Sequence, residues 1–224
     1  MSDLAVKTEP QESSTLDVLV LRISDGGGEV MAPTIEELLA SLPDTFRYSE
    51  ALEHVSERQL RRLIAGGTII ALSRGLYRKS DWLGDEDLIE IAAKAHNATL
   101  CLRSALARHE LIDDIPGEID IAIPRGSWTP ETRAPVRWRH FDPDTFEIGR
   151  DQLDIGGGRS IGIYSAERSI IDAFRMRHLA GADLANEALK RWLRRGGQPS
   201  ELLQMARSFP RALTALRETM EILL

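Results

Sequence analysis

The pattern of hydrophobic and polar positions first becomes regular just after Pro33. Thr34 and Glu37 have the spacing of a capping box, in which each side chain accepts a hydrogen bond from the other residue's backbone amide. Apolar residues then recur at i, i+3, i+4 and i+7, which predicts one buried face of a helix that ends before Pro43. These residues are Ile35, Leu38, Leu39 and Leu42. A second short helix is predicted over Tyr48–His54.

A third helix and a hairpin follow. Ser56 and Gln59 form another capping box, and the pattern predicts a helix over residues 57–65 that ends at Gly66-Gly67. Residues 68–72 and 76–79 then predict two strands, and the three-residue connection ending in Gly75 suits a hairpin with a glycine bulge. Three short helices followed by a β-hairpin predict a winged helix-turn-helix over residues 33–81.

The pattern changes after residue 81 and predicts a larger C-terminal domain over residues 82–224. Helices are expected over 85–96, 101–109, 166–179, 182–194, 200–207 and 211–224, and strands over 118–123, 136–141, 146–155 and 160–164. The glycine triplet 156–158 is interpreted as a hairpin turn. This order predicts a central antiparallel sheet packed by helices, so the expected fold class is α+β. Residues 1–32 are interpreted as a polar arm, with one short apolar run at 18–23.

Composition narrows the class of protein. The chain of 224 residues has a single cysteine, Cys101, so it can form neither an intrachain disulfide nor a zinc site built from several thiolates. No apolar run approaches the ~20 residues that cross a bilayer. The N-terminus lacks the pattern of a signal peptide. These features favour a cytoplasmic protein with no membrane partner.

The distribution of charge is more informative than its sum. The net charge is −7, yet residues 45–80 carry seven basic and three acidic side chains, which gives +4. A short basic segment in an acidic chain is typical of a small DNA-reading module. An arginine fork can pair with guanine in the major groove, and the free amides at a helix start can hold a phosphate. The predicted DNA contacts are Ser56, Arg58, Gln59, Arg61, Arg62, Arg74, Arg78 and Lys79.

A second basic cluster lies near the C-terminus. The side chains crowd a predicted helix end before Gly196-Gly197, where cations suit the helix dipole. A contact surface for RNA, DNA or an acidic partner is the alternative. The cluster consists of Lys190, Arg191, Arg194 and Arg195.

Signals for catalysis are weaker. Gly126-Ser127 followed by Asp142-Pro143-Asp144 partly matches a nucleotidyltransferase pattern, but Pro143 between the carboxylates favours a turn. The five histidines show no metal-ligand spacing. We therefore predict no catalytic residue, metal or cofactor. The tryptophans at 128, 138 and 192 are interpreted as core anchors.

Several segments resemble one family. The stretch Arg61–Tyr77 resembles the winged helix of the AbiEi antitoxins of type IV toxin–antitoxin systems, which act in abortive infection. Residues 101–111, 121–126 and 164–172 resemble the C-terminal domain of these antitoxins, so the resemblance covers roughly residues 33–224. It implies a transcriptional repressor that binds inverted repeats in the promoter of its own operon. In that family, the DNA contacts would fall here on Arg58, Arg61, Arg62, Arg74 and Arg78.

The resemblance also implies a second activity. The C-terminal domain would counteract a nucleotidyltransferase-like toxin, without a stable complex, and no residue can be assigned to this activity. Two alternatives remain open from the sequence. One is an enzyme, a nucleotidyltransferase or nuclease with a DNA-binding module. The other is a regulator that responds to a small ligand in the C-terminal domain.

Overall fold

The computed structural model describes residues 32–223, and residues 34–224 form one compact unit. The predicted arm, including the apolar run 18–23, lies outside the described residues except for Ala32. Among the described residues, no helix combines the length and apolar character that crossing a membrane requires. The described chain is a mixed α/β structure, in agreement with the coarse prediction of fold class.

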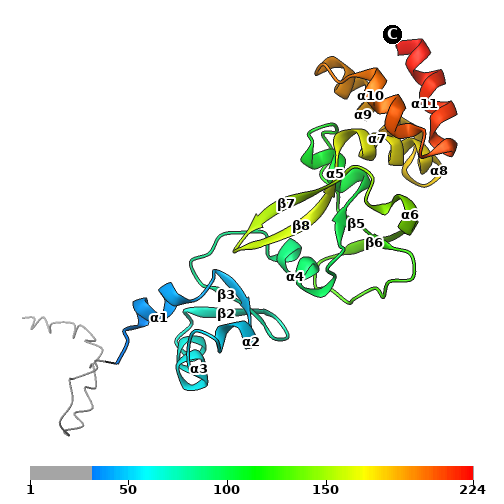
Figure 1. Cartoon of the computed structure of the whole chain (residues 1–224). Coiled ribbons are helices and arrows are strands. Elements are labelled where there is room, and N and C mark those ends of the chain that lie inside the picture. Colours follow the sequence, from blue (N-terminus) through cyan, green and yellow to red (C-terminus); the bar gives the residue numbers. More distant parts are fainter. Residues whose placement is uncertain (1–31, 224) are drawn as a thin grey trace, which may run out of the picture. The chain divides into compact units, whose positions relative to one another are not determined.

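The first part of the unit contains three short helices and a three-stranded sheet (Figure 1). The sheet has the order β1-β3-β2 and is antiparallel throughout. The elements are α1 (Ile35–Ser41), β1 (Thr45–Arg47), α2 (Tyr48–Ala51), α3 (Glu57–Ala65), β2 (Ile69–Ser73) and β3 (Leu76–Lys79). Both predicted capping boxes are present, and α3 and β3 have the predicted bounds. Strand β1 was not predicted, and α2 is shorter than predicted.

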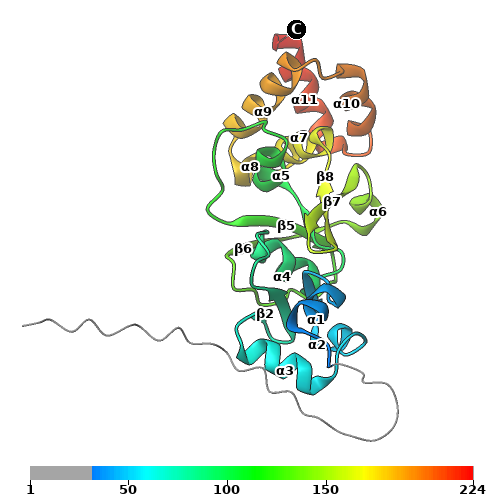
Figure 2. The ribbon, with the colours of Figure 1, turned by 90° about the vertical axis from the view of Figure 1, so that its left-hand side faces the viewer.

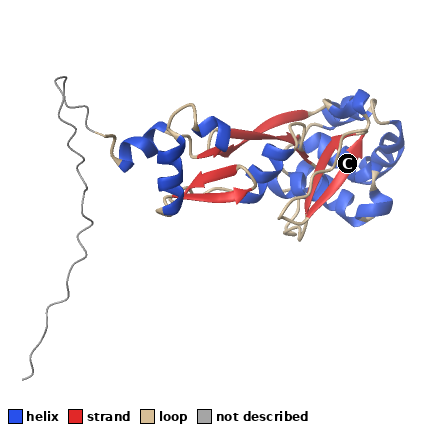
Figure 3. Ribbon diagram, turned by 90° about the horizontal axis from the view of Figure 1, so that it is seen from below, coloured by secondary structure: helices blue, strands red, loops and turns tan. Residues whose placement is uncertain are grey.

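The second part is built on a five-stranded sheet of order β6-β5-β4-β8-β7. Figure 2 shows α9, α10 and α11 gathered beyond one end of its strands, and Figure 3 distinguishes the helices from the strands by colour. Its strands are β4 (Thr99–Leu100), β5 (Ile119–Pro124), β6 (Val136–Phe141), β7 (Arg150–Gly156) and β8 (Arg159–Tyr164). The helices are α4 (Glu86–Lys94), α5 (Leu102–Arg108), α6 (Pro143–Phe146), α7 (Ala166–Arg175), α8 (Arg177–Ala180), α9 (Ala182–Arg194), α10 (Pro199–Ala206) and α11 (Pro210–Leu223).

The predicted antiparallel sheet is wrong, because the five-stranded sheet is mixed. Strands β5 and β6 are parallel, as are β4 and β8, whereas β4–β5 and β7–β8 are antiparallel. Residues 125–135 return the chain to the end of the sheet at which β5 begins, so β6 runs parallel to β5. Alternating apolar residues predict a strand but carry no information on its direction.

Three further predictions are corrected. Residues 146–149 do not begin a strand, because Asp142 caps the short helix α6 and β7 starts only at Arg150. The helix predicted over 166–179 breaks at Met176 into α7 and α8. Trp128 is 77% exposed and is no core anchor, whereas Trp192 is buried. The hairpin turn predicted at the glycine triplet is confirmed between β7 and β8.

The β2–β3 hairpin contributes to two hydrophobic cores. Ile69 packs with Phe46 of β1, with Leu60 of α3 and with other residues of the first part. Leu72 and Leu76 instead pack with α4 and the five-stranded sheet. Apolar side chains from before and after the predicted domain boundary at residues 81–82 therefore pack in one core.

A buried arginine organises the other end of the sheet. The guanidinium of Arg168 is fully buried, lies 4.3 Å from the ring centroids of both Tyr164 and Phe209, and donates to Asp172 over 3.0 Å. It also donates to the carbonyl of Thr145. Burial raises the pKa of Asp172, and the positive charge of Arg168 opposes that shift. The ion pair thus joins β8, α7 and the segments that precede β7 and α11.

We predict that Arg168→Ala strongly destabilises the protein. The change leaves the carboxylate of Asp172 buried without its main partner, which costs about 3–5 kcal/mol of the free energy of unfolding. Urea denaturation followed by circular dichroism measures the loss. The double variant Arg168→Met, Asp172→Leu removes both charges and should recover part of the stability. A single variant within about 1 kcal/mol of the wild type would contradict the prediction.

Candidate nucleic-acid interface

Local hydrogen bonds fix the start of α3. The Ser56 hydroxyl oxygen accepts from the Gln59 amide, and the Gln59 side-chain oxygen accepts from the Ser56 amide over 2.8 Å. The Ser56 hydroxyl also donates to that oxygen. Gln59 was predicted to contact DNA, but its side-chain oxygen is already engaged in the cap. The observed role of this pair is to set the direction in which α3 begins.

Two arginines on α3 are available for an external partner. Leu60 and Leu63 are buried, so the opposite face of the helix points to solvent and carries Arg58 and Arg62 one turn apart. Within residues 32–223, neither guanidinium has a hydrogen bond or ion pair to the protein. Arginine forks spaced by four residues on an exposed helix face can reach two successive groups along a groove.

Arg61 lies on the flank of the same helix and is held in place. Its guanidinium donates to Glu57 over 2.6 Å, and the Tyr48 hydroxyl donates to the same carboxylate oxygen over 3.3 Å. Tyr48 and Glu57 together raise the pKa of Arg61. The Arg61 side chain remains 74% exposed, so it can still contact an anion. The roles of Tyr48 and Glu57 in this arrangement were not predicted from the sequence.

The turn between β2 and β3 presents a further cation. Gly75 has φ +73°, the left-handed conformation that glycine adopts without strain, and its carbonyl accepts from the Tyr48 amide over 3.0 Å. Arg74 precedes it, is exposed, and has no protein partner in the described part of the chain. The hairpin tip is thus tied to α2 while its arginine stays free.

Arg78 and Lys79 were predicted to contact DNA, but both are mostly buried and form ion pairs within the protein. Arg78 pairs with Glu86 over 2.7 Å and donates to the carbonyls of Lys79 and Ser80, and only 16% of its side chain is exposed. Lys79 pairs with Asp44 over 3.1 Å and is 17% exposed. Both cations hold β3 to neighbouring segments, so we do not include them in the candidate interface.

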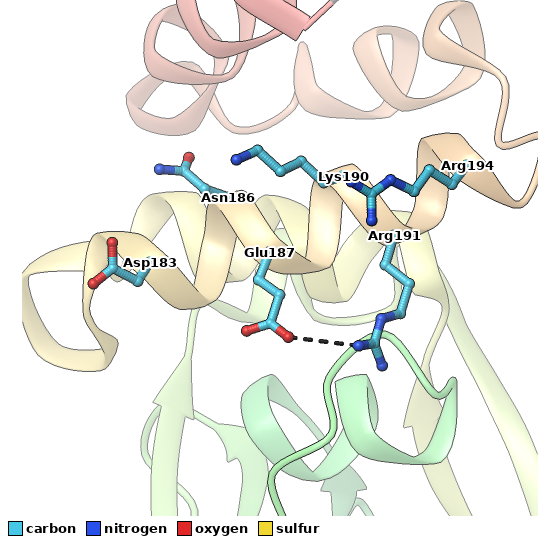
Figure 4. Close-up of a pocket in the computed structure, with 6 residues that line it drawn as sticks. All are labelled: Asp183, Asn186, Glu187, Lys190, Arg191 and Arg194. Carbon is cyan, nitrogen blue, oxygen red and sulfur yellow. Dashed lines mark ion pairs between the residues drawn. The ribbon is translucent and has the colours of Figure 1, made fainter.

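The C-terminal basic cluster divides in a similar way (Figure 4). Arg191 pairs with Asp113 and Glu187, and Arg195 pairs with Glu110, so both hold α9 to the segment after α5. The ion pair with Asp113 raises the pKa of Arg191. Lys190 and Arg194 point to another side of α9, line a shallow groove of about 350 Å³, and have no partner within the described residues.

The remaining candidates do not assemble a catalytic centre. Asp142 accepts from the Asp144 amide over 3.1 Å and lies 3.7 Å from Arg125, which fits the turn predicted for this segment. Within residues 32–223, no group of three or more His, Cys, Asp or Glu residues converges on a metal position. A second groove of about 410 Å³ lies between α4, α5 and the segment before β5. Apolar side chains form much of its lining, including Leu88, Leu100 and Ile119.

Comparisons with known proteins give little further information. No family model and no curated protein matches the chain. One solved structure that matches is the crystal structure of the RV2827C protein from Mycobacterium tuberculosis. It shares 18% sequence identity, the match covers 82% of this chain and 79% of that chain, and the TM-score is 0.48.

We predict that Ser56→Ala destabilises α3. Removing the hydroxyl leaves the Gln59 amide without its cap, which costs about 1 kcal/mol of the free energy of unfolding. Thermal and urea unfolding measure this effect, and Ser56→Asp serves as the matched control because aspartate also caps helices. Equal stability of the alanine and aspartate variants would show that the cap contributes nothing.

Proposed function

We propose that this protein is a transcriptional repressor that binds double-stranded DNA through α3 and the β2–β3 hairpin. The observation that carries the proposal is the set of exposed arginines Arg58, Arg62 and Arg74, which have no partner within the described residues although carboxylates pair with neighbouring cations. Unpaired arginines on a capped helix and on an adjacent hairpin tip provide both groove contacts and phosphate contacts.

We interpret residues 33–81 as a winged helix-turn-helix. The element order helix, strand, helix, helix, hairpin supports this interpretation. The short strand β1 also supports it, because it pairs with β3 and adds a third strand to the hairpin. In this arrangement α3 is the recognition helix and the turn at Arg74 is the wing. The helix enters the major groove with its outward side chains facing base edges.

The division of labour follows from side-chain chemistry. Arg58 and Arg62 are placed to pair with guanine O6 and N7, because a planar guanidinium donates two parallel hydrogen bonds to that edge. Arg61 contacts a phosphate from the flank, and Arg74 contacts the backbone beside the helix. The amides of Glu57 and Arg58 in the first turn of α3 hold a further phosphate. The amide and hydroxyl of Ser56 already donate to Gln59, so the role of Ser56 is to cap the helix.

We also propose an antitoxin activity in residues 82–224. This proposal rests on the resemblance of residues 101–111, 121–126 and 164–172 to the AbiEi antitoxins. The partner is a nucleotidyltransferase-like toxin, counteracted without a stable complex, and the promoter DNA carries inverted repeats. The protein acts without a cofactor and is not an enzyme under this proposal.

We predict that Arg62→Ala and Arg58→Ala each weaken binding to the operator by about 1–3 kcal/mol, because each removes a fork that reads a base. Arg74→Ala should weaken binding to all sequences alike and reduce the slope of log affinity against log salt by about 0.9. Fluorescence anisotropy with the DNA upstream of the protein's own gene measures both effects, with a scrambled duplex for comparison.

Arg217→Ala on α11 is the matched control for this experiment. Arg217 is exposed and the change removes the same charge, so its affinity should equal that of the wild type. Wild-type protein that binds the upstream and scrambled duplexes equally would refute the repressor assignment. Unchanged binding by the Arg58, Arg62 double alanine variant would remove α3 from the interface.

We predict that the full chain, expressed from an unrelated promoter, restores growth to cells that produce a nucleotidyltransferase-like toxin encoded beside its gene. Arg62→Ala should restore growth equally, because the antitoxin activity is assigned to the C-terminal part. Colony counts after induction measure the rescue, and affinity purification tests for a complex. Absence of rescue would refute the antitoxin proposal and leave the DNA-binding proposal standing.

A further inference from the structure

The segment that precedes α3 is held by the β7–β8 hairpin, whose turn lies 112 residues later in the sequence. Thr45, at the start of β1, is almost fully buried, and its hydroxyl donates to the Gly157 carbonyl over 3.0 Å. Gly157 lies in the turn between β7 and β8 with φ +62°, and a Cβ there would lie 2.7 Å from Thr45 side-chain atoms. The turn therefore approaches β1 as closely as a glycine permits.

Arg159 extends this contact to α2. Its guanidinium donates to the Thr45 hydroxyl oxygen over 3.3 Å and to Glu50 over 2.8 Å. The same oxygen of Glu50 accepts from the Arg47 amide over 2.7 Å at the start of α2. One carboxylate thus starts α2 and anchors it to the β7–β8 hairpin.

The anchored helix leads directly into α3. Residues 52–55 connect α2 to the cap at Ser56, and Val55 is buried in the same core as Ala51. The side chains of Arg159 and Glu50 are 20% and 42% exposed, so solvent screens their ion pair less than a pair between fully exposed side chains. A shift of α2 would be transmitted to the start of α3.

We propose that Arg159 is a positioning residue for DNA binding: through Glu50 and Thr45 it fixes the orientation of α3, and it does not itself contact DNA. This inference rests on the proposed function of α3. The side chain acts from within the C-terminal part, so the arrangement of that part contributes to operator affinity.

The salt dependence of binding separates positioning from contact. A lost phosphate contact reduces the slope of log affinity against log salt, whereas a misplaced helix weakens binding without removing a specific counterion-releasing contact. We expect Arg159→Ala to weaken operator binding about five- to tenfold, the lower end of the range for coupling between separate sites, with an unchanged slope. Arg74→Ala provides the comparison variant with a reduced slope.

Three further variants test whether Arg159 acts through Glu50. Glu50→Gln keeps an acceptor for the cap of α2 but removes the charge that pairs with Arg159. It should weaken binding like Arg159→Ala, and the double variant should be no weaker than either single one. Arg159→Lys should lie between the wild type and Arg159→Ala, because it keeps the charge but loses the fork. Thermal unfolding of each variant confirms that it is folded.

Hydrogen–deuterium exchange of the DNA-free full chain provides the second readout. Amides in residues 48–65 should exchange faster in Arg159→Ala than in the wild type, with no change in Arg217→Ala. Wild-type affinity of Arg159→Ala, a reduced salt slope, or unchanged exchange would each overturn the inference. Wild-type protein without operator preference would refute the proposed function, and the exchange result would still decide whether Arg159 positions α3.

Discussion

The structure depends on strand β3, whose two faces belong to two different cores. Leu76 packs toward α4 and the five-stranded sheet, whereas Tyr77 packs against the core of the first three helices. The alternation continues in the ion pairs, since Arg78 reaches Glu86 and Lys79 reaches Asp44. A strand with period two can serve both sides at once. A slip of one residue would turn each apolar side chain toward the wrong core and break both ion pairs.

This constraint explains why the hairpin is fixed to the C-terminal part. The bulge in β2 falls at Leu72, between Ala71 and Ser73, and a bulge leaves backbone groups outside the strand ladder. The Leu72 carbonyl accepts from Arg133 over 2.7 Å, and the Arg133 amide donates to the buried carboxylate of Glu90. The hairpin is therefore held by apolar packing, by ion pairs and by the hydrogen bond from Arg133 to the bulge. Its tip, at Arg74 and Gly75, is exposed to solvent.

The sequence predicts those features of the fold that local interactions determine. The capping box at Ser56 and the glycine pair after Ala65 give the bounds of α3, because both signals act within one helical turn. Strand β1 has three residues and β4 has two, so neither is long enough to show an alternating apolar pattern. Each forms because its backbone pairs with a strand that is distant in the sequence. Strand direction is equally invisible in the pattern, which is why the mixed sheet was not anticipated.

The candidate site shows the same limit, side chain by side chain. Arg74 and Arg78 are the same residue type in the same basic segment of the sequence. In the structure, Arg78 pairs with Glu86 and is mostly buried. Arg74 instead occupies a turn that no carboxylate of the described chain reaches. Arg159 lies 109 positions from Glu50, so no spacing rule could have joined them. Whether an arginine binds the protein or remains free for a ligand depends on which acids the tertiary fold brings near it. The free cations of α3 and the hairpin tip are therefore a property of the folded chain, and the distribution of charge along the sequence indicates only where to look for them.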